Sequence, residues 1–137
     1  NEWLKDTGLT LGIGLFTSGM LQTGLKTLVG RSRPIEQRGA FAYNMFSDSP
    51  GYHSFPSGHV AVATSISYII ARRSKSVPVK IVFYGLAGIT AISRMYTDAH
   101  WISDVAFGSV LAIGCSELAI QYVDRIRKHK NQQAKLN

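Results

Sequence analysis

Long stretches without a charged side chain set the strongest limit on how this chain can fold. Residues 7–25 carry no charge, and as an α-helix they would be about 28 Å long. That length nearly matches a bilayer hydrocarbon core of about 30 Å. Gly8 and Gly12, four residues apart, would let a neighbouring helix approach closely in lipid. The stretch is therefore typical of a membrane-spanning helix.

Three further runs are almost uncharged, and none alternates like a strand. Residues 60–71 and 81–93 carry no charge, and residues 105–123 carry only Glu117. The pattern predicts an all-α helical bundle of about four main helices, which we expect to be transmembrane. The expected helices lie at about residues 7–29, 58–72, 78–93 and 99–128. The connection 35–55 is long and rich in aromatic residues, which favours a functional loop.

The composition suits one folded domain, because 45% of the 137 residues are hydrophobic and 17% are charged. Cys115 is the single cysteine, which excludes an intrachain disulfide and a cysteine-based zinc site. We expect a single domain over residues 1–137. The chain opens with Asn1 rather than Met, so N-terminal spans could be missing from it.

The formal net charge of +7 is concentrated in two places. Residues 72–80 and 124–137 each sum to +4, and the rest is nearly neutral. Because this pattern offers no continuous basic groove, we expect no nucleic-acid partner. If all four helices cross a bilayer, both basic stretches lie on one side, which the positive-inside rule makes cytoplasmic. The 35–55 loop would then face the outside, or periplasm, of an inner (cytoplasmic) membrane.

Three clusters combine ionisable side chains with special backbone residues at the ends of the apolar segments. In the first, Lys26 and Arg33 are two helical turns apart and would share a face if the helix continued to Pro34. In the second, Ser57 is a candidate N-cap, and the N–H groups of residues 57–59 could face an anion. Taken alone, these clusters also suit a basic helix end and an ordinary capped helix.

The third cluster places His100 and Asp104 four residues apart, so that on a helix they lie on one face. Asp104 could accept a hydrogen bond from one imidazole nitrogen and leave the other free to attack an electrophile. A surface histidine–carboxylate pair has the same spacing. A serine-hydrolase site built on Ser93 or Ser57 lacks the expected Gly-x-Ser-x-Gly turn. A metal site would combine His53, His59, His100 and Asp104, but these residues do not have a recognisable ligand spacing.

The order of the three clusters is more informative than any one of them. The pattern Lys-x6-Arg-Pro, Pro-Ser-Gly-His, Ser-Arg-x5-His-x3-Asp resembles the type 2 phosphatidic acid phosphatase (PAP2) superfamily, which includes membrane lipid phosphatases, soluble bacterial acid phosphatases and vanadium haloperoxidases. Every fixed position matches: Lys26, Arg33, Pro34, Pro56, Ser57, Gly58, His59, Ser93, Arg94, His100 and Asp104. The resemblance implies an active site at one end of the bundle. Membrane members usually have six spans, whereas we count four.

The resemblance also implies a role for the matched side chains. His100 would attack phosphorus and form a phosphohistidine, with Asp104 orienting it, while His59 would protonate the leaving oxygen and later activate water. The phosphoryl oxygens would be held by Lys26, Arg33, Ser57, Gly58 and Arg94. The resemblance implies no metal and no other cofactor.

We therefore expect a membrane phosphatase that hydrolyses a lipid phosphate or diphosphate through a phosphohistidine, with a phosphorylated lipid as its substrate. One alternative is a soluble periplasmic non-specific acid phosphatase or a vanadium haloperoxidase-like enzyme. Another, from a different class, is a non-catalytic protein that binds a phosphorylated lipid. The sequence does not specify the lipid, a preference for mono- or diphosphate, or the oligomeric state.

Overall fold

Four long helices account for most of the described part of the chain, residues 1–136, in this computed structural model. Their bounds are Glu2–Val29 (α1), Gly58–Arg73 (α2), Val77–Tyr96 (α3) and Ile102–Gln133 (α4). Two short 3-10 helices, Pro34–Glu36 and Pro50–Tyr52, lie between α1 and α2. Across residues 1–136 the only extended pairing is an isolated bridge between Arg31 and Tyr43. The prediction of an all-α chain with four main helices is confirmed.

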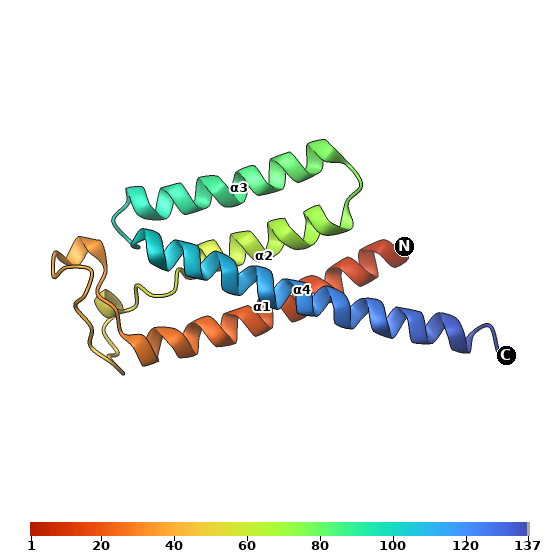
Figure 1. Cartoon of the computed structure of the whole chain (residues 1–137), viewed down its shortest axis with the longest axis horizontal. Helices are drawn as coiled ribbons and strands as arrows, with labels where there is room; N and C mark the ends of the chain where they lie inside the picture. The colour runs from red at the N-terminus through yellow and green to blue at the C-terminus, as the bar shows by residue number, and fades with distance from the viewer. Residues whose placement is uncertain (137) are drawn as a thin grey trace.

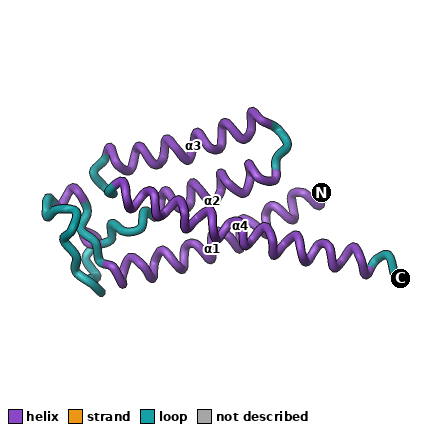
Figure 2. Tube along the Cα trace, in the orientation of Figure 1, coloured by secondary structure: helices purple, strands orange, loops and turns teal. Residues whose placement is uncertain are grey.

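The helices form an elongated bundle in which α3 lies on the outside (Figure 1). α1 packs against α4 and α2, whereas α3 packs mainly against α2. Figure 2 shows that the long α1–α2 connection and the short α3–α4 connection gather at the same end of the bundle. The α2–α3 connection and both chain ends lie toward the opposite end (Figure 1). Segments far apart in the sequence therefore meet at one end.

Apolar side chains are exposed on the outside of the bundle, above all on α3. This helix has no buried residue, and Ile81, Ile89 and Ile92 are 64–67% exposed. In water such a surface would be costly, at about 25 cal/mol per Å² of apolar area. α3 and α4 are long and apolar enough to cross a membrane, with mean hydropathies of 1.3 and 1.4. The chain is that of a membrane protein, although only two of the four expected crossings pass this test.

Gly30 ends α1 and turns the chain into the loop. It adopts a left-handed conformation (φ 56°, ψ 45°), and its N–H donates to the Lys26 carbonyl at 3.0 Å. A side chain here would collide with the Asn44 carbonyl, so backbone angle and packing both require glycine. Because α1 stops at Val29, Arg33 lies in the loop. The helix therefore ends where the sequence predicts, near residue 29, and the condition under which Lys26 and Arg33 would share a helix face is not met.

Candidate active site

A cavity of about 650 Å³ lies at the end of the bundle where the loops gather. The end of α1, the start of α2, the loop after α1 and the turn before α4 all contribute to it. The predicted site residues that line it are Lys26, Arg33, Gly58, His59 and His100. The other predicted residues, Ser57, Arg94 and Asp104, are not part of this lining. The fold thus brings side chains from three separate segments to one cavity.

The cavity joins a charged end to an apolar wall. Val62, Ala63 and Ile66 form the wall from successive turns of α2, and Thr90 of α3 completes it. His59, in the first turn of the same helix, is exposed and lies at the charged end. A ligand with an anionic head and an apolar body would match both parts.

Lys26, Arg33 and Arg94 supply positive charge at this end of the molecule. The Lys26 ammonium donates to the carbonyls of Pro56 at 2.8 Å and His53 at 3.1 Å, which fixes it beside the entry to α2. The Nε atoms of Arg33 and Arg94 are buried and have no hydrogen-bond partner among the described residues. A buried donor without an acceptor is unfavourable, so an anion bound nearby would satisfy these guanidinium groups.

The start of α2 differs from the expected anion site in one respect. Ser57 is the N-cap residue, but its N–H donates to the Asp104 carbonyl at 3.1 Å. The expectation that this N–H faces an anion is therefore wrong. Within residues 1–136 the N–H groups of Gly58 and His59 have no acceptor. An anion at the start of α2 could therefore bind to these two N–H donors and to the positive end of the helix dipole.

His100 lies in the turn before α4 and is only 4% exposed. Its Nδ1 is 2.6 Å from the Ser54 carbonyl oxygen. Since a carbonyl only accepts, Nδ1 carries the proton, and Nε2 keeps its lone pair in the neutral ring. Burial above all, with Lys26 and Arg33 adding to it, lowers the pKa of His100 from 6.5 to about 4. The ring is therefore neutral near pH 7 and has one nitrogen free to act as a nucleophile.

Asp104 is fully buried in the first turn of α4. His100 precedes that helix, so the i, i+4 geometry does not apply, and the expected direct hydrogen bond between the two side chains is absent. The carboxylate instead accepts from Arg31 and from the Ser54 hydroxyl, both at 2.5 Å, and from the Trp101 N–H at 2.8 Å. Asp104 is therefore linked to His100 through Ser54.

Sequence reasoning missed three polar residues at this site: Gln22, Arg31 and Ser54. Gln22 lies one turn before Lys26, and its Oε1 is buried in the cavity lining without a partner among the described residues. The spacing of four from Lys26 could have revealed it. Arg31 was overlooked because an arginine after a helix end usually faces solvent, yet it is 7% exposed. No sequence signal distinguishes Ser54 from the other serines of the loop.

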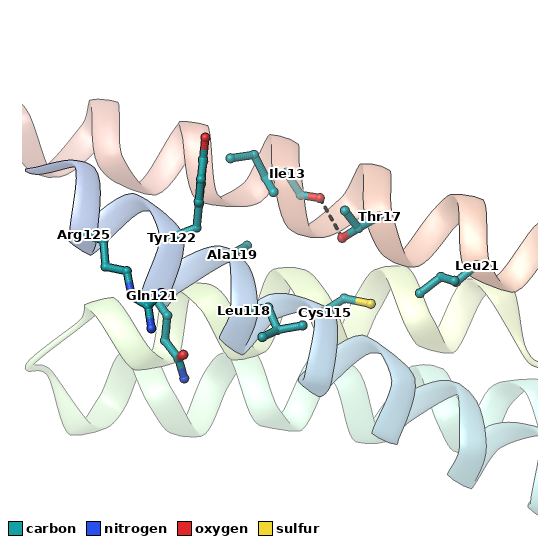
Figure 3. Close-up of a pocket in the computed structure, with 9 residues that line it drawn as sticks. All are labelled: Ile13, Thr17, Leu21, Cys115, Leu118, Ala119, Gln121, Tyr122 and Arg125. Carbon is teal, nitrogen blue, oxygen red and sulfur yellow. Dashed lines mark hydrogen bonds between the residues drawn. The ribbon is translucent and has the colours of Figure 1, made fainter.

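A second cavity, of about 530 Å³, lies between α1 and α4 and contains none of the predicted site residues (Figure 3). Its lining is mostly apolar, and Arg125 is the one cation in it. Cys115 lies in its wall and is 8% exposed, as expected for a small core residue. Its lining residues are Ile13, Thr17, Leu21, Cys115, Leu118, Ala119, Gln121, Tyr122 and Arg125. This cavity lacks the histidines and converging cations of the first.

The comparisons with known proteins agree with the motif order. Residues 7–128 match the family model described as PAP2 superfamily. The chain is 34% identical over 119 residues to decaprenylphosphoryl-5-phosphoribose phosphatase of Mycobacterium tuberculosis, covering 87% of this chain and 59% of that protein. It is 34% identical over 111 residues to lipid A 1-phosphatase of Rhizobium etli, covering 76% of this chain and 46% of that protein. The chain thus spans about half the length of these curated relatives.

The fold is shared with a solved structure. The crystal structure of Aquifex aeolicus LpxE matches with a TM-score of 0.74 and 24% sequence identity, covering 86% of this chain and 69% of that chain. The family model spans the helices that build the cavity as well as the loops that carry its charged residues. On the strength of that match, the chain belongs to the PAP2 superfamily.

Proposed function

We propose that this chain hydrolyses a lipid phosphate or diphosphate through a phosphohistidine intermediate on His100. The observation that carries the proposal is the convergence of cations and two histidines, from three separate segments, on one cavity with an apolar wall. The cations would hold the phosphoryl oxygens, whose charge must be stabilised as the bond to the leaving group breaks.

The chemistry would proceed in two steps. In the first, the Nε2 lone pair of His100 attacks phosphorus, a P–N bond forms, and the P–O bond to the leaving group breaks. His59 gives its proton to the departing oxygen. In the second step His59 takes a proton from water, whose oxygen attacks phosphorus and breaks the P–N bond. Phosphate leaves, and both histidines return to their starting states.

The other predicted residues would support these steps. Lys26, Arg33 and Arg94 would neutralise the phosphoryl oxygens together with the Gly58 N–H. The Ser57 hydroxyl, buried and without a partner among residues 1–136, would turn toward the same oxygens. These assignments use no metal and no organic cofactor.

A lipid is the substrate class that the surroundings favour. The two named relatives are, by their names, phosphatases of a decaprenyl-linked sugar phosphate and of lipid A. In this chain the charged end of the cavity adjoins the apolar wall of α2, and α3 exposes apolar side chains along its length. Those features would suit a substrate that stays partly in the bilayer, and they disfavour the soluble acid phosphatase and haloperoxidase alternatives.

We propose the cytoplasmic membrane as the location, with the site on its outer face. Residues 72–80, around the α2–α3 connection, and residues 124–136, at the end of α4, together carry nine of the 15 basic residues. Both stretches lie at the opposite end of the bundle from the loops that contribute to the cavity (Figure 1). Positive residues collect on the cytoplasmic side, which would leave the cavity outside.

A phosphate-release panel tests the activity. The chain in detergent would be given phosphatidate, an undecaprenyl diphosphate, a lipid A phosphate and a water-soluble monoester. We expect release from at least one lipid, and loss of release in His100→Ala but not in His129→Ala, which removes an exposed histidine at the end of α4. Equal release by wild type and His100→Ala, with both proteins folded, would exclude the proposal.

Three further experiments separate the alternatives. Recovery of the protein from membranes in an alkaline carbonate wash without detergent would favour the soluble phosphatase. Oxidation of halide that depends on peroxide and added vanadate would favour the haloperoxidase. Lipid binding without phosphate release from any substrate would favour the non-catalytic binding protein.

A further inference from the structure

A buried hydrogen-bond network stands behind the proposed nucleophile. It consists of Arg31, Asp104 and Ser54, and we refer to it as the Arg31 network. Arg31 donates to the Asp104 carboxylate at 2.5 Å, and the Ser54 hydroxyl donates to the same carboxylate at 2.5 Å. The Ser54 carbonyl then accepts from Nδ1 of His100 at 2.6 Å. These three residues and His100 are all buried.

Arg31 is itself fixed from several sides. Its Nε donates to the Ala40 carbonyl at 2.9 Å, and one Nη also donates to the Ser103 hydroxyl at 2.6 Å. The guanidinium lies 5.7 Å from the centroid of the Trp101 ring, a distance that favours a cation–π contact. A guanidinium held this way can direct its remaining N–H groups with little freedom.

Ser54 is held at both its main chain and its side chain. Its N–H donates to the Arg31 carbonyl at 3.0 Å, while its hydroxyl is bound by Asp104. The direction of its carbonyl, which accepts the hydrogen bond from His100 Nδ1–H, is therefore set by Arg31 and Asp104 together. None of these three residues lines the cavity, and their polar groups are already engaged with one another and with His100, so they act behind the nucleophile.

We propose that Arg31 and Ser54 are positioning residues that hold His100 in the Nδ1–H tautomer, with Asp104 as the anion between them. The inference deepens the proposed function, on which it rests. A direct aspartate–histidine contact would place the negative charge on the ring itself. Here the carboxylate is paired with Arg31, and the ring faces a neutral carbonyl.

The pairing has a consequence for titration. The charged and titratable groups near the ring are Lys26 of α1, Arg31 and Arg33 of the loop, His59 of α2 and Asp104 of α4. Arg94 of α3 is linked to His100 through the main chain, because its carbonyl accepts from the His100 N–H at 3.3 Å. Replacing Arg31 with a neutral residue leaves the buried Asp104 charge uncompensated. That charge would stabilise protonated His100, so the nucleophile would be lost at a higher pH.

The test compares full-length wild type with Arg31→Gln, Arg31→Lys and Ser54→Ala in detergent. Arg38→Gln is the matched control, because Arg38 lies in the same loop but is half exposed and pairs with Glu36. The first readout is the rate of labelled phosphoryl-enzyme formation across pH. The second is the ¹⁵N-histidine NMR spectrum without substrate, which reports the tautomer of His100.

For Arg31→Gln we expect phosphoryl-enzyme formation to slow by about 10- to 100-fold. We also expect the acid limb of its pH–rate profile to move up by about one pH unit. Arg31→Lys should restore the position of the acid limb and part of the rate. Ser54→Ala should slow the reaction and reduce the Nδ1–H population, because the carbonyl loses its anchor. Arg38→Gln should match wild type in every readout.

A folded Arg31→Gln protein with the wild-type rate, acid limb and tautomer would overturn the inference. If Arg31→Gln does not fold, Ser54→Ala provides the test. A wild-type rate and a wild-type His100 tautomer in Ser54→Ala would then overturn the inference. If wild type forms no phosphoryl-enzyme, the proposed function fails. The tautomer shift between wild type and the variants would then still support or overturn the positioning role on its own.

Discussion

The long-range ion pairs at the two ends of this bundle differ in burial. At the cavity end, Arg31 and Asp104 form a buried ion pair that lies within a network of hydrogen bonds. At the far end, Arg127 pairs with Asp6, and Arg73 pairs with Asp124. Each far-end pair has one half-exposed partner. The burial of the first pair and the exposure of the others give the two ends different energetics.

The difference in burial indicates which ion pair of this fold is connected with function. A buried pair is strongly destabilising to break, because the remaining charge has no solvent to compensate it. A pair with one half-exposed partner is partly screened by solvent, so it contributes less to stability. Breaking the buried pair at the cavity end should therefore cost more stability than breaking a far-end pair, and we attribute the buried pair to the positioning of His100. Substitutions of the charged residues at the far end should change the free energy of unfolding less.

The largest expected effect is on folding at the cavity end. Asp104→Asn removes the charge that Arg31 faces and weakens the link to Ser54. We expect a loss of about 3–5 kcal/mol in the free energy of unfolding, measured by denaturant titration in detergent. The matched variant Asp124→Asn, at the far end, should lose less, because its carboxylate is half exposed and Arg73 keeps its hydrogen bond to Thr10. Equal losses in the two variants would remove the contrast.

The next effect is on catalysis. Lys26→Met removes a cation at the cavity and should lower kcat/KM for the preferred lipid phosphate by about 100- to 1,000-fold. Lys128→Met, at the exposed far end of α4, should leave kcat/KM within about twofold of wild type. Initial rates at low substrate concentration give both values. A full rate in Lys26→Met would show that this ammonium does not bind the phosphoryl group.

The expected helices and the three clusters were predictable from the sequence, because charge-free runs and motif order are local properties. The contacts between clusters were not. The spacing of His100 and Asp104 predicts a direct pair only if both lie on a helix, and the helix begins after His100. Gly30 likewise ends α1 before Arg33. Helix ends are set by capping and packing, which spacing alone does not determine.

The hydrogen-bond partners of buried polar groups were also not predictable from the sequence. Ser54 has the same local composition as its loop neighbours, and only the folded loop brings its hydroxyl to Asp104. The N–H of Ser57 was expected to be free, but packing of α4 places the Asp104 carbonyl against it. A Cβ at Gly108 would lie 2.8 Å from the Ser57 carbonyl oxygen, so glycine permits that close approach. These contacts depend on tertiary packing, and no periodicity in the sequence predicts them.

An intermediate effect is expected from pH. The pKa of His100 falls from 6.5 to about 4 on folding, so between these values the unfolded chain binds more protons than the folded one. Stability from this group is complete above about pH 6.5 and is lost as the pH falls toward 4, by up to about 3 kcal/mol. Denaturant titrations at both pH values should show a smaller loss in His100→Ala. The exposed-site variant His129→Ala should lose as much as wild type.

The smallest effect is expected at the far end itself. Arg127→Gln removes the half-exposed partner of Asp6 from a pair whose N···O distance is 2.7 Å. We expect a change below about 1 kcal/mol in the free energy of unfolding, and a smaller one at high salt. The comparison of low- and high-salt titrations checks this. A loss as large as that of Asp104→Asn would mean that both ends depend equally on their ion pairs.

The central claim is tested most directly by locating the covalent intermediate. Wild type would be mixed briefly with a lipid phosphate labelled at phosphorus, quenched in base and analysed by peptide mass spectrometry. The account predicts phosphate on His100 that is stable in base and lost in acid, and none in His100→Ala. Label on another residue, or phosphate release at the wild-type rate by folded His100→Ala, would contradict it.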